Sequence, residues 1–146
     1  MTRERFNSLF GKYQAWGLSI IPITYKGKNP LVPWKKYQER RPQVGELAEW
    51  FYDDETTKNI GIVCGRVSGN LVVLDFDRKE VWDKWLKSWD EGKWGSIYDA
   101  TPVVETGQGH HVYLRTKSPV SKTKANGIDI QGEGSCIVAP PSVHRS

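Results

Sequence analysis

Two aspartates separated by one residue end an apolar run from Leu71 to Asp77. In a β-strand, Asp75 and Asp77 would present both carboxylates to one surface while Phe76 points to the opposite side, because side chains alternate between the two faces. Two like charges this close need a cation, and oxygen ligands select hard ions such as Mg²⁺ or Mn²⁺, which also bind phosphate oxygens. The alternative is that both residues cap a following helix, where aspartate is favoured. The spacing by itself leaves the two interpretations open.

An acid pair after an apolar strand also occurs in phosphatases of the haloacid dehalogenase type and in glycosyltransferases that use nucleotide sugars. In the phosphatases, a small residue such as threonine or glycine follows soon after the second acid. This chain has Arg78, Lys79 and Glu80 there. In the glycosyltransferases, a larger domain precedes the motif, and a chain of 146 residues leaves little room for one. Both enzyme classes are therefore disfavoured.

A turn with two glycines precedes an alternating strand in the segment from Thr106 to Leu114. Glycine lets backbone N–H groups approach a phosphate closely, and a histidine just beyond the turn can donate a hydrogen bond to it. If His111 faces the site, His110 faces the other side, so one histidine of the pair is expected to serve it. An ordinary hairpin turn with two partly exposed histidines is the alternative.

A third acid, Asp129, lies between two isoleucines in a strand-like run. An acid in such a place must be solvated, paired or bound to a metal, because burying it unpaired is costly. Further on, Pro140 and Pro141 predict an extended exit from the last strand, from which Ser142 and His144 can project polar groups. The alternative for this tail is an ordinary ordered loop.

Taken in order, these segments resemble the bifunctional DNA primase/polymerase N-terminal domain, which belongs to the archaeo-eukaryotic primase superfamily. The motifs of that family are two acids separated by one residue, a histidine preceded two residues earlier by a small residue, and a later single aspartate. Here they look like Asp75 with Asp77, Gly109 with His111, and Asp129. Segments 28–35 and 50–51 are also similar to the opening part of the family, so the resemblance covers nearly the whole chain.

The resemblance implies an α+β fold in which an N-terminal αβ unit packs on an RRM-like, mostly antiparallel sheet, with the active site in the cleft between them. It implies template-directed nucleotidyl transfer, that is, DNA primase and DNA polymerase activity in DNA replication, catalysed with two Mg²⁺ or Mn²⁺ ions. The substrates would be a single-stranded DNA template and primer with NTP or dNTP, and the partner a helicase module in the same or a separate chain. Such domains occur widely on plasmids and phages.

The resemblance also assigns roles to individual residues. Asp75, Asp77 and Asp129 would bind the two metal ions and, together with His111, form the catalytic set. The residues expected to bind the nucleotide are His111, Gly109, Ser142 and His144. Two alternatives stay open: a DNA-binding replication-initiation module without catalysis, and a metal-dependent phosphatase or nuclease. The intact set of acids favours catalysis over binding alone, and the absent phosphatase context favours transfer over hydrolysis.

The sequence departs from the family in two places. The position two residues before the histidine, often serine in the wider superfamily, is Gly109, so a hydroxyl contact from it is absent. The chain also stops at Ser146, where members of the family usually continue. We therefore expect residues 1–146 to be a single catalytic domain that is C-terminally truncated or a minimal core.

Basic residues gather in two segments, 26–41 and 115–124. The formal net charge of +4 and a pI near 9.1 favour an anionic partner, without proving that it is nucleic acid. Nucleic-acid phosphates are bound mainly by such charges, although solvated loops are rich in lysine in any case. The candidates for template binding are Lys35, Lys36, Arg115, Lys117, Lys122 and Lys124.

The elements that must position these residues follow from hydrophobic periodicity. Helices are expected over 5–16, 44–52 and 80–89, and the tryptophans of the last one share an apolar stripe, which favours core packing over base stacking. Strands are expected over 18–23, 60–64, 71–76, 103–105, 111–115, 127–130 and 136–139. Turn residues between 60–64 and 71–76 predict a hairpin. This order predicts an α+β fold with a largely antiparallel sheet.

Cysteine use and hydropathy predict the compartment. Cys64 and Cys136 lie in apolar, strand-like segments, which predicts buried free thiols in a reducing compartment. The N-terminus lacks an apolar signal run, and no stretch of about 18 uninterrupted apolar residues exists. We therefore expect a cytoplasmic protein that does not enter a membrane.

Overall fold

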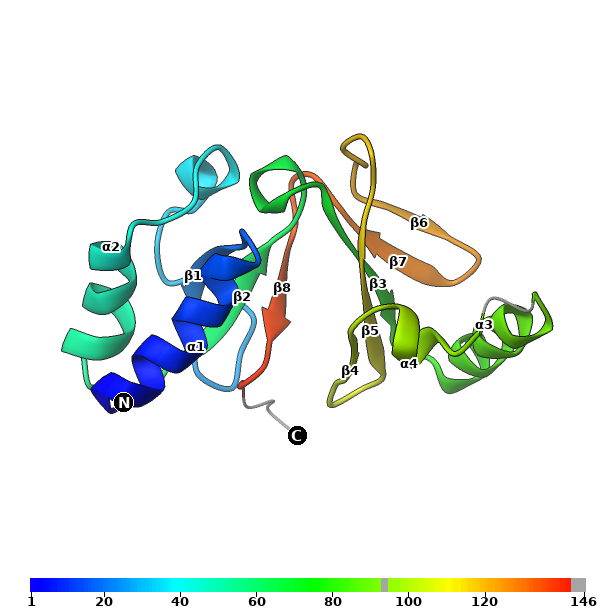
Figure 1. Cartoon of the computed structure of the whole chain (residues 1–146), viewed down its shortest axis with the longest axis horizontal. Coiled ribbons are helices and arrows are strands. Elements are labelled where there is room, and N and C mark those ends of the chain that lie inside the picture. The colour runs from blue at the N-terminus through cyan, green and yellow to red at the C-terminus, as the bar shows by residue number, and fades with distance from the viewer. Residues whose placement is uncertain (93–94, 143–146) are drawn as a thin grey trace.

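The computed structural model describes residues 1–92 and 95–142, and the strands of these residues form two antiparallel sheets (Figure 1). The smaller sheet has the order β1-β2-β8, and the larger sheet has the order β4-β5-β3-β7-β6. Each pairing between these strands is antiparallel. With the helices that accompany them, the two sheets confirm the predicted α+β class.

The smaller sheet and its helices form the first unit of the fold. Its elements are α1 (Arg3–Ala15), β1 (Ser19–Ile23), η1 (Lys35–Gln38), α2 (Val44–Ala48), η2 (Glu49–Asp53), β2 (Asn59–Val63) and β8 (Cys136–Ala139). Phe6 and Phe10 of α1 pack in one core with Phe51 of η2 and with buried residues of the strands. The helix predicted over 44–52 is a short α-helix continued by a π-helical turn.

Local signals at both ends of α1 explain its length. The hydroxyl of the N-cap Thr2 accepts a hydrogen bond from the Arg5 amide at 3.1 Å. The helix ends before Gly17, whose φ of 72° is a left-handed conformation that glycine adopts without strain. β1 follows at once, and all five of its residues are buried. The helix predicted over 5–16 and the strand predicted over 18–23 are confirmed here.

The larger sheet carries the second unit. Its elements are β3 (Leu71–Phe76), α3 (Lys79–Glu91), α4 (Ile97–Ala100), β4 (Val103–Glu105), β5 (His110–Arg115), β6 (Thr123–Ala125) and β7 (Ile128–Gln131). Trp82 of α3 is 5% exposed and shares a core with Phe76 and Val112 of the sheet. Trp85 and Trp89 are partly buried and pack against the same core, so these tryptophans have the packing role that their spacing predicts. α4 and β6 are too short to produce a periodic pattern in the sequence.

The predicted hairpin between 60–64 and 71–76 is wrong, because β2 and β3 belong to different sheets. An isolated bridge between Gly65 and Leu71 closes the intervening turn, which contains η3 (Arg66–Ser68). Turn residues change the direction of a chain but do not choose the partner of the next strand. Both edges of β3 are occupied by β5 and β7. The chain therefore crosses from one sheet to the other here, and it crosses back between β7 and β8.

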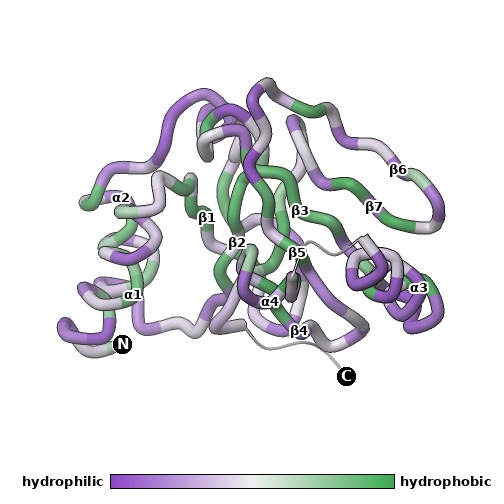
Figure 2. Tube along the Cα trace, turned by 45° about the vertical axis from the view of Figure 1, so that its right-hand side comes forward, coloured by the Kyte–Doolittle hydropathy of each residue, from purple (hydrophilic) through white to green (hydrophobic). Residues whose placement is uncertain are grey.

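One face of the larger sheet lies against the first unit. Hydrophobic residues follow β1, β2 and β3 through the middle of the molecule, while hydrophilic residues dominate the outer loops (Figure 2). Leu71 and Val73 of β3, with Tyr113 of β5, pack into the core of the first unit. Because side chains alternate along a strand, the next residue of β3 on this face is Asp75. The apolar interface thus leads directly into the acidic segment.

Both cysteines are free thiols, with Cys64 buried and Cys136 half-buried. Burial raises the pKa of the Cys64 thiol to about 12 and also raises the pKa of Cys136. Both thiols are therefore protonated at neutral pH. Among the helices of the described residues, none combines the length and the apolar character needed to cross a membrane.

Candidate active site

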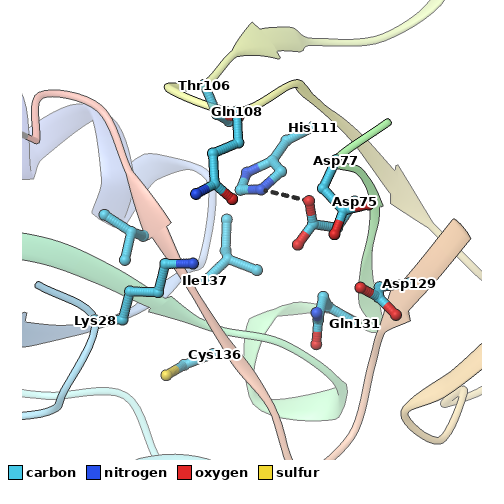
Figure 3. Close-up of a pocket in the computed structure, with 11 residues that line it drawn as sticks. Lys28, Asp75, Asp77, Thr106, Gln108, His111, Asp129, Gln131, Cys136 and Ile137 are labelled. Atoms are coloured by element: carbon cyan, nitrogen blue, oxygen red, sulfur yellow. Dashed lines mark ion pairs between the residues drawn. The ribbon is translucent and has the colours of Figure 1, made fainter. Parts of the chain in front are cut away.

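A cavity of about 290 Å³ lies between the two units (Figure 3). One wall belongs to the larger sheet and the turn beside it, and the other to the first unit. The residues that line the first wall are Asp75, Asp77, Thr106, Gln108, His111, Asp129 and Gln131, and those of the second are Lys28, Cys136, Ile137 and Val138. All three predicted metal-binding aspartates and the predicted histidine are thus brought to one cavity from separate parts of the chain.

Strand register explains why these side chains meet. Asp75 of β3 lies directly opposite His111 of β5 on one side and Asp129 of β7 on the other. Directly opposed residues in an antiparallel pair have Cβ atoms about 5 Å apart on the same face. Asp77 follows Asp75 by two residues and lines the same cavity. One row across three strands therefore carries a histidine and two acids, with the third acid one step beyond.

Asp75 and His111 are already in contact, with Nε2 of the imidazole 3.3 Å from Oδ1 of the carboxylate. Burial by itself would raise the pKa of Asp75, but hydrogen bonds from His111 and Gln131 and the charge of Lys28 outweigh it, so the pKa is below its ordinary value. The Nδ1 atom of His111 is buried and has no hydrogen-bond partner among the described residues. The ring therefore has hydrogen-bonding capacity that these residues do not use.

Asp129 contacts a lysine, whereas Asp75 contacts a histidine. Lys124 of β6 lies opposite Asp129 in the register, and Nζ of Lys124 is 3.7 Å from Oδ1 of Asp129. Lys124 is a predicted template-binding residue, and its template role stays a prediction. In the structure its ammonium group is a neighbour of a candidate metal ligand.

Gly109 occupies a place where a side chain does not fit. A Cβ atom built on it would lie 1.7 Å from the carbonyl oxygen of Phe76. Its amide donates a hydrogen bond to the Thr106 hydroxyl at 2.9 Å, and its carbonyl accepts one from the Thr106 amide at 2.7 Å. The amide predicted to approach a phosphate is therefore engaged within its own turn. In the structure, the absence of a side chain at Gly109 lets β5 start close against β3.

The two neighbouring histidines face opposite sides of the sheet, as strand alternation predicts. His111 lines the cavity, while the ring of His110 stacks on Trp82 with centroids 4.1 Å apart and planes 7° from parallel. One histidine of the pair therefore belongs to the cavity. The other anchors α3 to the start of β5.

Ser142 and His144 are the remaining predicted nucleotide-binding residues. The Ser142 hydroxyl accepts a hydrogen bond from the Ile60 amide at 3.1 Å and donates to the Ala139 carbonyl. It thus joins the end of β8 to β2 and is absent from the described lining of the cavity. His144 lies outside the described residues. The nucleotide-binding roles of both residues stay predictions.

The predicted template-binding residues do not share one place in the fold. None of the six is among the described residues that line the cavity; they are Lys35, Lys36, Arg115, Lys117, Lys122 and Lys124. Arg115 donates a hydrogen bond to the carbonyl of Trp16 and so links the two units. Lys36 lies over the ring of Tyr37, 5.2 Å from its centroid. Their contact with DNA stays a prediction.

Several residues of the cavity carry no clear motif in the sequence. Gln131 follows Asp129 by two positions in one strand, so strand alternation could have placed it on the same face. Gln108 lies between the two glycines of the predicted turn, which is a weaker signal. Lys28 lies in segment 28–35, whose similarity to the family assigns no role to it, and Ile137 reaches the cavity only through the packing of the two units.

The donor set can be compared with the needs of a divalent metal ion. Asp75, Asp77 and Asp129 offer carboxylate oxygens on one wall, and Gln131 adds an amide oxygen, which suits Mg²⁺ or Mn²⁺. Among the described residues, however, no three His, Cys, Asp or Glu side chains are close enough together to hold an ion. Asp75 is engaged with His111, and Asp129 lies beside Lys124. The chemical type and the face of the donors therefore suit a divalent ion, and metal binding by these residues stays a prediction.

Comparison with known proteins gives one result for the family. The family described as bifunctional DNA primase/polymerase, N-terminal, matches residues 11–146. No curated protein matches the chain significantly. The match leaves out only the first ten residues and includes every residue that lines the cavity. The chain therefore belongs to the bifunctional DNA primase/polymerase N-terminal family.

Proposed function

We propose that this chain catalyses template-directed nucleotidyl transfer, adding NTP or dNTP to a primer on single-stranded DNA, in the cavity between the two sheets. Membership of the family gives it a primase/polymerase-type role in DNA replication, with DNA and nucleotides as substrates. The observation that carries the assignment to this cavity is the row of His111, Asp75 and Asp129 across three strands, with Asp77 beside it. A helicase module is the expected partner.

Two Mg²⁺ or Mn²⁺ ions would be held by Asp75, Asp77 and Asp129, and when bound they would activate the primer 3′-hydroxyl and neutralise charge on the leaving pyrophosphate. The chain itself supplies the placement of these groups. β3 holds Asp75 in the middle of the sheet, where neighbouring strands on both sides fix its backbone. The local changes that the proposal requires are the rotation of Asp129 away from Lys124 and of Asp75 away from His111.

His111 is proposed to bind the phosphates of the incoming nucleotide. Its side chain is 10% exposed and is fixed by β5, so its direction is set before a substrate arrives. One ring nitrogen faces Asp75, and the other has no partner among the described residues. Nδ1 is buried, so the nitrogen that can serve a phosphate is Nε2, which can donate to a phosphate oxygen once Asp75 turns toward a metal ion.

The part of the opposite wall that β8 forms is apolar and uncharged. The edge strand β8 lines this wall with Cys136, Ile137 and Val138, of which Ile137 and Val138 are apolar. The Cys136 thiol is protonated because burial raises its pKa, so it adds no charge. Such a wall can pack against the sugar or base while the carboxylates face the phosphates.

Primer extension and de novo primer synthesis on single-stranded DNA test this proposal. The wild type is compared with a variant that carries Asp75→Asn and Asp77→Asn, in Mg²⁺, in Mn²⁺ and in chelator. We expect metal-dependent product that falls by at least about 100-fold in the variant. Asp90→Asn is the matched control, since Asp90 is exposed on α3 and should leave the product unchanged.

Other products would identify other functions. DNA binding without nucleotide incorporation would contradict catalysis and favour a replication-initiation module. Phosphate release or strand cleavage in place of extension would favour a hydrolase at the same acids. Circular dichroism of each variant shows whether a loss of product reflects chemistry or folding.

A further inference from the structure

Lys28 is the single lysine or arginine among the described residues that line the cavity. It comes from the first unit and points across the cavity toward the wall that carries Gln108, His111 and Asp75 (Figure 3). Its charge is close enough to Asp75 to lower the pKa of that carboxyl. Lys28 therefore brings a positive charge to the acidic wall from the opposite side.

The loop that presents Lys28 is held by its own hydrogen bonds. The Thr24 amide donates to the Asn29 carbonyl at 2.9 Å, and the Thr24 hydroxyl donates to the same oxygen at 3.0 Å. The Gly27 amide donates to the Thr24 carbonyl at 2.9 Å, and the Asn59 side chain donates to the Gly27 carbonyl at 3.5 Å. An antiparallel bridge between residues 23 and 30 closes the base of the loop. The backbone of Lys28 is thus fixed, and its side chain alone is free to adjust.

A bound nucleotide would bring excess negative charge into the cavity, and the positive charge of Lys28 can offset it. Three carboxylates already offset most of the charge that two divalent ions would bring. A triphosphate adds further negative charge in the same space, and a compact ammonium group is well suited to contact phosphate oxygens as a point charge. Lys28 lies on the wall from which such a contact can be made without displacing a metal ligand.

We propose that Lys28 binds the β- and γ-phosphates of the incoming nucleotide, across the cavity from the carboxylates. The inference rests on the proposed function, since it takes a nucleoside triphosphate as the substrate. It makes Lys28 a contact to the leaving pyrophosphate that comes from the unit opposite the acids. Nucleotide binding then links the two sheets through one side chain.

Nucleotide binding to the full chain tests this proposal by calorimetry. The affinities of dNTP, dNMP and inorganic pyrophosphate, each with Mg²⁺, are compared for the wild type, Lys28→Ala, Lys28→Met and Lys28→Arg. We expect Lys28→Ala and Lys28→Met to weaken dNTP and pyrophosphate binding by about tenfold, as for the loss of a charged hydrogen bond, and dNMP binding by less than about twofold. Lys28→Arg should keep most of the affinity, because it keeps the charge.

Lys26→Ala is the matched control from the same loop. Nζ of Lys26 lies over the ring of Tyr25, 5.5 Å from its centroid, and Lys26 does not line the cavity. Its dNTP affinity should stay within about twofold of the wild type, because it loses no phosphate contact. In primer extension, Lys28→Ala should raise the KM for dNTP and weaken inhibition by added pyrophosphate, with the affinity for primer-template unchanged.

Three results would overturn the proposal: unchanged dNTP affinity in Lys28→Ala, equal losses for dNTP and dNMP, or a loss confined to primer-template affinity with a smaller salt dependence. The last result would place Lys28 on the DNA backbone instead. A wild type that binds dNTP but does not extend primers would refute the proposed function while the binding comparison still decides the role of Lys28. A wild type that binds no nucleotide would refute both.

Discussion

Lys124 and Asp129 lie opposite each other on β6 and β7, with Nζ 3.7 Å from Oδ1 of the carboxylate. Asp129 is also the cross-strand neighbour of Asp75. The same carboxylate therefore has a lysine on one side and the proposed metal ligands on the other. Any divalent ion that binds Asp129 competes with the ammonium group of Lys124.

Removal of Lys124 should strengthen metal binding. In Lys124→Ala, the Asp129 carboxylate loses its competing cation, and we expect Mn²⁺ affinity to rise by about two- to fivefold, the scale of one exposed ion pair. Titration followed by Mn²⁺ electron paramagnetic resonance measures this affinity directly. Lys84→Ala, an exposed lysine on α3, should leave it unchanged. Equal or weaker Mn²⁺ binding in Lys124→Ala would show that the pair does not limit the site.

Gly109→Ala should destabilise the protein, because its Cβ would overlap the Phe76 carbonyl oxygen. We expect the free energy of unfolding to fall by about 1–3 kcal/mol as the start of β5 moves away from β3. His111 lies two residues further along β5, so dNTP affinity should fall as well. Chemical denaturation and calorimetry measure the two effects.

Gly11→Ala provides the matched comparison. Gly11 lies inside α1, where a Cβ would meet no atom within 4 Å, and alanine there should raise the free energy of unfolding by about 0.5–1 kcal/mol. Similar effects of the two substitutions would mean that the close approach of Gly109 to β3 is not required.

The first unit has a carboxylate whose protonation should reduce stability in acid. A hydrogen bond from Arg40, with others from the Gln43 amide and the Tyr37 hydroxyl, outweighs burial and lowers the pKa of Glu46 to about 2. Because the folded-state pKa lies below the ordinary value of 4.5, the stabilisation is complete above that value and is lost as pH falls toward 2.

Glu46→Gln tests this assignment. We expect it to lower the free energy of unfolding by about 1–2 kcal/mol at neutral pH, and the difference from wild type should shrink as pH falls from about 5 toward 2. Thermal unfolding across this range measures the difference. Glu49→Gln, at an exposed position, should show little difference at any pH. A constant difference for Glu46→Gln would mean that the charge of Glu46 contributes nothing.

Trp82 should act as a core residue and not as a platform for bases. It is 5% exposed and contacts Phe76 and His110, so Trp82→Ala should lower the free energy of unfolding by about 3–5 kcal/mol. Trp16→Ala removes a side chain of a residue that is 47% exposed and should cost less than about 1.5 kcal/mol. Urea unfolding compares the two, and a small effect at Trp82 would contradict its assignment to the core.

Periodicity in the sequence was sufficient to predict α1, β1, the acidic end of β3 and the packing role of the α3 tryptophans. These features depend on neighbours a few residues away, where helical or strand alternation decides which side a residue faces. The family also follows from local motifs, since Asp75, Asp77, His111 and Asp129 each lie in a short recognisable segment. Gln131 was within reach of the same alternation argument.

The tertiary structure alone decided which strands pair and therefore which residues meet. A turn after β2 looks the same whether β3 returns to β2 or enters another sheet, so the hairpin could not be excluded from the sequence. The register that sets Asp75 between His111 and Asp129, the ion pair of Asp129 with Lys124, and the approach of Lys28 from the other unit all depend on contacts between distant segments. Such contacts are chosen by the packing of whole sheets, which no local pattern of residues specifies.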